Sequence, residues 1–127
     1  MNYKPIAQIT FLVLSSLLLT SLLLVTLWML LQRKKAVLIP ANTPQNTVIL
    51  DQKRVIIGRS SEADIMILDP SVSSTHCLLF YKGGRFFIKD LGSKNGTFVN
   101  GEPVILSALN DGDLIKIGER EFVFKIE

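Results

Sequence analysis

Three short polar clusters hold the residues of this chain that could take part in chemistry. Gly58-Arg59 is the first, Ser73-Ser74-Thr75-His76 is the second, and the third is the stretch LGSKNGTFVNG from Leu91 to Gly101. Asparagine-glycine pairs and isolated glycines are typical of turns that hold backbone and amide groups at fixed positions. The clusters also supply a guanidinium, an ammonium, hydroxyls and amides, which are the donors that a phosphate or a peptide backbone requires. Such a set favours the binding of a phosphorylated peptide over catalysis.

The sequence offers little support for an enzyme. It contains one histidine, His76, and one cysteine, Cys77, which stands in the apolar run Cys77–Tyr81. It has no metal-spaced group of His and Cys, no nucleophile elbow and no phosphate-cradling glycine loop at the start of a helix. We therefore expect Cys77 to be a buried side chain rather than a nucleophile. We also expect no catalytic residue, no cofactor and no bound metal.

Short strands separated by turns are expected to position the polar clusters. Runs of β-branched and aromatic residues alternate with turn formers such as Lys82-Gly83-Gly84, Asn100-Gly101 and Asn110–Asp113. Many short strands without helices indicate an all-β sandwich or barrel. We expect Pro40–Thr47 to be a loop. The expected strands are Val37–Ile39, Val48–Leu50, Arg54–Ile57, Ile65–Leu68, His76–Tyr81, Phe86–Lys89, Thr97–Val99, Val104–Leu106, Leu114–Ile117 and Phe122–Ile126.

A leucine-rich segment, Ile9–Leu31, precedes these strands and contains no charged residue over 23 positions. As a helix it is about 35 Å long, against about 30 Å for the hydrocarbon core of a bilayer. A cleaved signal peptide is the alternative, but the apolar part of such a peptide usually has about 7–15 residues. No small-x-small cleavage pattern follows the segment, and Trp28 near its end suits an interfacial anchor. We predict an uncleaved single transmembrane helix.

Basic residues flank this helix unequally. Arg33, Lys34 and Lys35 follow it, whereas Lys4 precedes it. The excess of positive charge predicts a single-pass protein of the cell membrane, with its N-terminus outside and its C-terminal part in the cytoplasm. We divide the chain into a tail 1–8, a transmembrane helix 9–31, a basic juxtamembrane segment and domain start 32–47, and a sandwich 48–127, with residue 36 as the alternative start of the sandwich.

The net charge of +3 is a property of the flanks rather than of the sandwich. Four of the 14 basic residues precede Ala36, so that ten basic side chains stand against 11 acidic ones from there onward, a net charge of −1. A nucleic-acid-binding domain carries its basic residues clustered on the domain, so we exclude nucleic acid as a partner. The basic residues beside the helix favour anionic lipid, and membrane lipids are the partners expected of the helix.

The order and spacing of the three polar clusters resemble the forkhead-associated (FHA) domain family. Its pattern is Gly-Arg, then Ser-x-x-His, then Ser-x-Asn-Gly-Thr-x-x-Asn-Gly; here these are Gly58-Arg59, Ser73–His76 and Ser93–Gly101. The resemblance covers roughly Ala36 to Glu127 and implies an FHA-like β-sandwich of about eleven strands that binds phosphothreonine in an extended peptide. It implies phosphopeptide contacts for Arg59, Ser73, Ser74, Lys94 and Asn95, and structural support of the site for Gly58, His76, Gly96, Thr97 and Asn100.

The side-chain chemistry agrees with these implied roles. Arg59 is a permanently charged fork that can bond two phosphate oxygens, and the Ser73 hydroxyl can donate to a third. Asn95 offers both a donor and an acceptor to a peptide backbone. One position departs from the family, because Ser74 stands where an arginine is common, which removes a potential charge beside the phosphate.

These observations predict a membrane-anchored phosphothreonine-peptide-binding module that acts as an adaptor in Ser/Thr kinase signalling. Its expected partners are phosphothreonine-containing proteins, either Ser/Thr kinases or their substrates. The alternative is a structural component of a membrane complex that uses an FHA-like sandwich for protein interaction without phosphate. The presence of Arg59, Ser73 and Asn95 favours the first reading, because a purely structural domain has no need of them.

Overall fold

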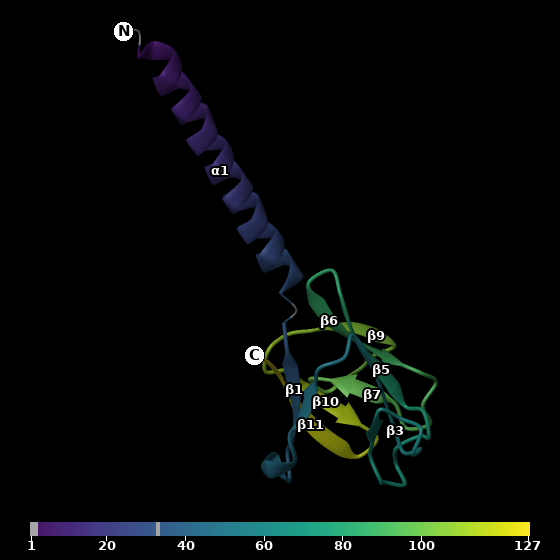
Figure 1. Cartoon of the computed structure of the whole chain (residues 1–127). Coiled ribbons are helices and arrows are strands. Elements are labelled where there is room, and N and C mark those ends of the chain that lie inside the picture. Colours follow the sequence, from purple (N-terminus) through teal and green to yellow (C-terminus); the bar gives the residue numbers. More distant parts are fainter. Residues whose placement is uncertain (1–2, 33) are drawn as a thin grey trace. The chain divides into compact units, whose positions relative to one another are not determined.

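The computed structural model describes residues 3–32 and 34–127, which fall into two units divided between Arg33 and Lys34. The first unit contains one helix, and the second, Lys34–Glu127, is a β-sandwich (Figure 1). Arg33, one of the three basic residues that follow the apolar segment, and residues 1–2 of the predicted tail lie outside the described residues.

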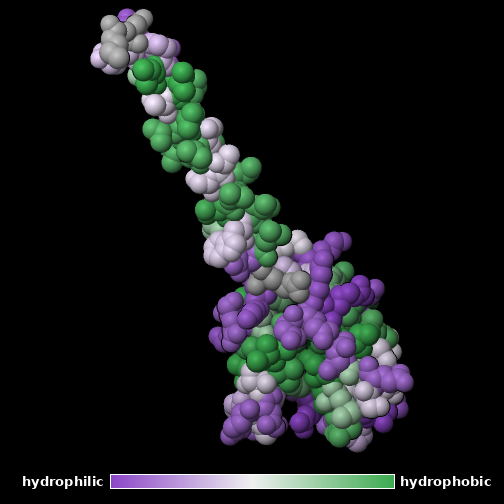
Figure 2. Space-filling model, in the orientation of Figure 1, coloured by the Kyte–Doolittle hydropathy of each residue, from purple (hydrophilic) through white to green (hydrophobic). Residues whose placement is uncertain are grey.

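The helix α1 spans Lys4–Leu31 and begins five residues before the predicted apolar segment. Pro5 stands in its first turn, where a residue without an N–H costs the helix no hydrogen bond. None of its side chains is buried in the protein, and Figure 2 shows hydrophobic surface along most of its length. Its length and apolar composition are those of a membrane span, and a signal sequence near an N-terminus has them as well.

The hydroxyl groups of α1 are satisfied within the helix itself. Ser15, Ser16 and Ser21 each donate to the carbonyl oxygen three residues earlier, at 2.8–2.9 Å, and so do Thr20 and Thr26. A hydroxyl that bonds its own backbone needs no water. The polar residues of α1 are therefore compatible with apolar surroundings.

Eleven strands form the sandwich within the described part of the chain. They make a six-stranded sheet in the order β2-β1-β11-β10-β7-β8 and a five-stranded sheet in the order β4-β3-β5-β6-β9. Neighbouring strands are antiparallel except for the parallel pair β3 and β4. The predicted all-β sandwich of about eleven strands is thus confirmed. The strands are β1 (Ala36–Pro40), β2 (Val48–Leu50), β3 (Arg54–Gly58), β4 (Ile65–Met66), β5 (Cys77–Lys82), β6 (Arg85–Asp90), β7 (Thr97–Val99), β8 (Glu102–Pro103), β9 (Leu106–Leu109), β10 (Leu114–Ile117) and β11 (Arg120–Ile126).

Alternating apolar residues of the two sheets form the core. Ile115, Ile117 and Phe124 are fully buried, whereas Lys116 and Lys125 between them point outward. Ile57 and Ile88 come from the other sheet. This is the alternation expected of strands with one buried face.

Cys77 belongs to this core. Its side chain has no solvent exposure, and burial raises the pKa of the thiol to about 12. Because the thiolate is the nucleophilic form of cysteine, the thiol is unreactive in the folded chain. The prediction of a small buried side chain is confirmed.

The predicted strand Val104–Leu106 is wrong. After β8, the N–H of Val104 still donates to the carbonyl oxygen of Thr97 in β7 at 2.9 Å. The chain then crosses to the other sheet, where β9 begins at Leu106. The carbonyl oxygen of Ile105 accepts the N–H of Asp90 at 2.8 Å, so the chain changes sheets between Val104 and Ile105, and the Ile105 side chain is 80% exposed. The apolar run Val104–Leu106 therefore has the pattern of a single strand, although the chain changes sheets within it. The predicted loop Pro40–Thr47 contains a short 3-10 helix, η1, at Pro44–Asn46.

The strand directions give the sandwich two distinct ends (Figure 1). At one end, which we call the loop end, β3, β5 and β6 meet through the pairs Ile57–Cys77 and Cys77–Asp90. At the other, which we call the hairpin end, β5 turns into β6 at Lys82–Arg85, and β1 begins at Ala36 beside Leu50. The polar clusters around Arg59, Ser73 and Lys94 follow or precede strands at the loop end.

Candidate functional site

The first two polar clusters are joined by backbone hydrogen bonds at the loop end. The N–H of Arg59 donates to the carbonyl oxygen of Ser73 at 2.9 Å, and that of Ser60 donates to Ser74 at 3.2 Å. Gly58 makes this approach possible, because a Cβ added there would overlap the backbone carbonyl group of Ser74. The glycine is therefore required by the close contact of two chain segments rather than by a turn.

His76 joins the second cluster to the third. Its imidazole has no solvent exposure; Nδ1 lies 3.0 Å from the N–H of Ser73 and Nε2 lies 2.9 Å from the carbonyl oxygen of Gly96. Since the Ser73 N–H can only donate, Nδ1 accepts, and the ring proton on Nε2 is donated to Gly96. One side chain thereby spans two loops that are 20 residues apart in the sequence.

The third cluster is folded around the carboxylate of Asp90. This group accepts hydrogen bonds from the hydroxyls of Ser93 (2.5 Å) and Thr97 (2.8 Å) and from the N–H groups of Gly92 and Ser93 (3.0 Å each). Partial burial raises the pKa of Asp90, but these hydrogen bonds outweigh burial and hold that pKa below its usual range. Thr97 is fully buried, and Gly96 adopts a positive φ of 85° while its N–H donates to the Ser93 hydroxyl.

Arg59 is held by one edge of its guanidinium. Its Nε donates to the carbonyl oxygen of Val72 at 3.0 Å, and its side chain is exposed. No carboxylate of residues 3–32 or 34–127 forms an ion pair with it. The outer N–H groups of the fork therefore remain available to an anion, in a direction fixed by the inner one.

Ser73 and Lys94 are coupled through the Ser73 hydroxyl. The Lys94 N–H donates to Ser73 Oγ at 3.0 Å, which uses an oxygen lone pair and leaves the hydroxyl proton free to donate outward. The Lys94 side chain is exposed and, like that of Arg59, takes part in no ion pair within the described ranges. A guanidinium, a hydroxyl proton and an ammonium are thus presented at the same end of the sandwich.

Asn95 is anchored by one N–H of its amide, which donates to the carbonyl oxygen of Ser71 at 2.8 Å. The Ser71 hydroxyl donates to Asp69 at 2.6 Å and accepts the N–H of Glu119 at 2.8 Å. Hydrogen bonds from the hydroxyl and N–H of Ser71 hold the pKa of Asp69 below its usual range. The amide oxygen and the second amide N–H of Asn95 remain for a ligand.

Two of the predicted site residues stand apart from this network. Ser74 is exposed, and its carbonyl group rather than its hydroxyl takes part in the contacts of the loops. Asn100 lies at the far end of β7 from Thr97, where its amide donates to Asp113 and accepts the N–H of Leu114. Asn100 therefore braces a turn at the hairpin end, not the polar loops.

Sequence reasoning missed Asp90 and Ser71. Asp90 stands three residues before Ser93, a spacing at which an aspartate commonly accepts backbone and hydroxyl donors of the following turn, so a local signal existed. Ser71 had no such signal, because its partners Asn95 and Glu119 are 24 and 48 residues away.

Comparison with known proteins agrees with this geometry. The sequence profile of the FHA domain matches residues 55–118. The glycogen accumulation regulator GarA of Mycolicibacterium smegmatis is 42% identical over 76 residues, which are 60% of this chain and 48% of GarA. The chain thus spans about half the length of the curated relatives it matches.

Solved structures resemble the sandwich closely. One comes from a structural and functional analysis of phosphothreonine-dependent FHA domain interactions; it has a TM-score of 0.69 and 32% identity, and the match covers 73% of this chain and 97% of that one. Mycobacterium tuberculosis EmbR, in complex with a low-affinity phosphopeptide, has a TM-score of 0.72 and 33% identity over 76% of this chain and 25% of EmbR. Because the first of these chains is almost entirely sandwich, this fold needs no further segment to form.

Replacing His76 tests its place in the network. His76→Ala leaves the Ser73 N–H and the Gly96 carbonyl group without a partner in a buried place, so we expect the free energy of unfolding of residues 34–127 to fall by about 2–4 kcal/mol. Urea unfolding measures the change. Thr75→Ala, at the exposed neighbouring position, is the matched control and should stay within about 0.5 kcal/mol. Equal effects of the two substitutions would contradict the bridging role of the imidazole.

Proposed function

The chain belongs to the FHA domain family, and on that premise we propose that it is a membrane-anchored phosphothreonine-peptide-binding module, an adaptor in Ser/Thr kinase signalling. The proposal is supported by two similar solved structures, one described by phosphothreonine-dependent interactions and one bound to a phosphopeptide. Similarity to GarA, a regulator, and to oxoglutarate dehydrogenase inhibitors of Corynebacterium supports a regulatory role in which the domain acts by binding.

The observation that carries the proposal is the set of unpaired donors at the loop end. A phosphothreonine has a charge of about −1.5 to −2 at neutral pH and three acceptor oxygens. Arg59 meets two of these oxygens with its outer N–H groups, and Ser73 meets the third with the hydroxyl proton that its hydrogen bond from the Lys94 N–H leaves free. Lys94 adds a second positive charge. None of these donors requires rearrangement before the phosphate arrives, which lowers the entropic cost of binding.

Asn95 holds the peptide beside the phosphate. One of its amide N–H groups is committed to Ser71, so its orientation is set before binding. The free oxygen and N–H then pair with the backbone of the ligand on either side of the phosphothreonine. Ser74 contributes a hydroxyl at the edge of the site where an arginine would contribute charge, so affinity rests on Arg59, Ser73 and Asn95.

The anchoring part of the proposal is supported by the length and apolar composition of α1. The helix has the length of a membrane span, and β1 begins at the hairpin end, opposite the loops. A sandwich attached in this way leaves its loop end accessible to partners in the cytoplasm. Tethering raises the local concentration of the module near membrane-bound kinases and substrates, so that a modest peptide affinity suffices.

Peptide titration tests the binding function. Residues 34–127 should bind phosphothreonine peptides from a library and bind the unphosphorylated controls at least about tenfold more weakly, because charge-assisted hydrogen bonds contribute about 1.5–3 kcal/mol. Arg59→Ala should weaken binding by about tenfold or more for the same reason. Arg54→Ala, an exposed arginine at the opposite end of β3, is the matched control and should leave the affinity unchanged. Equal binding by wild type and Arg59→Ala would refute the proposal.

Topology is tested on the full chain in sealed cells. We expect the chain to stay in the membrane pellet after alkaline extraction at the mass of the uncleaved protein. We expect an added protease to digest the sandwich only after permeabilisation, because the basic flank predicts a cytoplasmic location for it. A shortened mass would instead indicate a cleaved signal sequence, and digestion from outside would reverse the orientation.

A further inference from the structure

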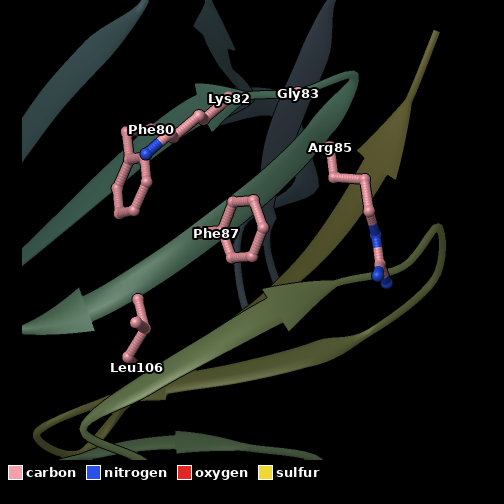
Figure 3. Close-up of a pocket in the computed structure, with 6 residues that line it drawn as sticks. All are labelled: Phe80, Lys82, Gly83, Arg85, Phe87 and Leu106. Carbon is pink, nitrogen blue, oxygen red and sulfur yellow. The ribbon is translucent and has the colours of Figure 1, made fainter.

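A second surface of the sandwich lies far from the polar loops. On the outer face of the five-stranded sheet, near the hairpin end, side chains of β5, β6 and β9 surround an open hollow of about 420 Å³ (Figure 3). Its floor is apolar: the rings of Phe80 and Phe87 stack with centroids 5.4 Å apart at an angle of 17°, and Leu106 beside them is 57% exposed. Apolar residues on the outer face of a sheet are not needed for the core.

The rim of this hollow is basic. Lys82 and Arg85 flank the turn between β5 and β6, and Lys53 and Arg54 lie at the start of the adjoining strand β3. All four side chains are exposed, and no ion pair formed by the residues that the structure describes includes any of them. These four cations cluster around the turns 51–53 and 83–84, in which Asp51 is the only acidic residue. The acidic residues Asp111 and Glu127 lie at the same end beside β1 and β11, where Asp111 accepts the N–H of Ile126 and the N–H of Glu127 donates to the carbonyl oxygen of Lys35.

The basic hollow lies at the same end of the sandwich as Ala36, where the chain enters, although on the other sheet. Ala36 is paired with Leu50, and the turn after Leu50 leads into β3. In this turn the carbonyl group of Lys53 accepts the N–H of Tyr81 at 3.0 Å, which connects the turn to β5 beside the hollow. Only residues 32–35 separate the last residue of α1, Leu31, from Ala36, and the five Cα–Cα steps between these two residues reach at most about 18 Å. In an anchored chain, this short connection keeps Ala36, and with it the hairpin end, within reach of the lipid headgroups. Lys34 and Lys35 in this connection are exposed and add to its charge.

We propose that this hollow binds an anionic phospholipid of the bilayer in which α1 is anchored. Lys82 and Arg85, whose side chains lie on opposite sides of Phe87 in Figure 3, each pair with a phosphate of the anionic headgroups, and the apolar part of the lipid lies against Phe80, Phe87 and Leu106. Clusters of basic residues beside a membrane span attract anionic lipid, and aromatic side chains favour the interface between headgroups and acyl chains. The proposal rests on the anchoring part of the proposed function and does not depend on phosphothreonine binding.

Lipid binding at the hairpin end would orient the sandwich. With Lys82 and Arg85 on the headgroups, the opposite end, which carries Arg59, Ser73 and Lys94, is directed away from the bilayer. The loops would then stay clear of the negatively charged surface, which would otherwise compete for the same cations. An acidic apolar peptide matches the chemistry of the hollow as well, but the position of the hollow beside the chain's connection to α1 favours lipid.

Vesicle binding tests the proposal on residues 34–127, which contain the whole sandwich. Phosphatidylcholine vesicles with added phosphatidylglycerol should sediment the protein, and vesicles of phosphatidylcholine alone should not. The double variant Lys82→Gln/Arg85→Gln should bind the anionic vesicles about thirtyfold more weakly, the effect of two interfacial basic residues. Lys116→Gln/Arg120→Gln is the matched control, because it removes two basic residues around the β10–β11 turn at the loop end; its vesicle binding should stay within about twofold of wild type.

The same samples are titrated with a phosphothreonine peptide, so that failures can be told apart. Wild type and Lys82→Gln/Arg85→Gln should bind the peptide equally. The lipid proposal would be overturned, and the proposed function left intact, if wild type binds the phosphothreonine peptide but not the anionic vesicles. Equal vesicle binding by Lys82→Gln/Arg85→Gln and Lys116→Gln/Arg120→Gln would have the same meaning. An acidic apolar peptide is also tested as a competitor. The hollow would be assigned to a protein partner if this peptide displaces the protein from vesicles, binds wild type more tightly than the vesicles do, and does not bind Lys82→Gln/Arg85→Gln. Absence of peptide binding in wild type would instead refute the proposed function.

Discussion

The buried imidazole of His76 is the contact on which the loop end depends. It accepts the Ser73 N–H and donates to the Gly96 carbonyl group, so it fixes the separation between the two loops that present Ser73 and Lys94. The Lys94 N–H then reaches the Ser73 hydroxyl oxygen, and this hydrogen bond leaves the hydroxyl proton free to donate to a ligand. A geometry of this kind cannot be made by either loop alone, because each supplies only half of the hydrogen bonds. The imidazole is thus structural, although histidine is chemically versatile.

Carboxylates shape the loop end without neutralising it. Asp90 is occupied by two hydroxyls and two backbone N–H groups of its own loop, and Asp69 is occupied by Ser71. Both are therefore satisfied by local donors, and neither forms an ion pair with Arg59 or Lys94 in the described chain. The negative charges support the loops while the positive charges stay available to an anion. A second set of basic residues lies on a different surface, at the hairpin end. The net charge of the sandwich therefore describes the charge of neither surface.

The sequence predicted the sheet architecture and the order of the polar clusters because both depend on local patterns. Alternation over Phe122–Ile126 identifies a half-buried strand, and glycine-rich clusters identify turns. The crossing of the chain at Val104–Ile105 escaped prediction, since an apolar run does not reveal which sheet it joins. The resemblance to the FHA family implied that Asn100 supports the site, yet the strand β7 separates it from Thr97, and it braces the turn of Asp113 instead. Pairings such as Asn95 with Ser71 depend on tertiary structure and left no local trace.

The central claim is that Arg59, Ser73, Lys94 and Asn95 meet the phosphate and backbone of one phosphothreonine peptide. Backbone amide shifts of residues 34–127, followed by NMR during titration with such a peptide, test it residue by residue. We predict the largest changes at Arg59, Ser73, Lys94 and Asn95, and none of comparable size at Lys82–Arg85. Changes centred on the hairpin end, or no changes at the loop end at saturating peptide, would contradict the account.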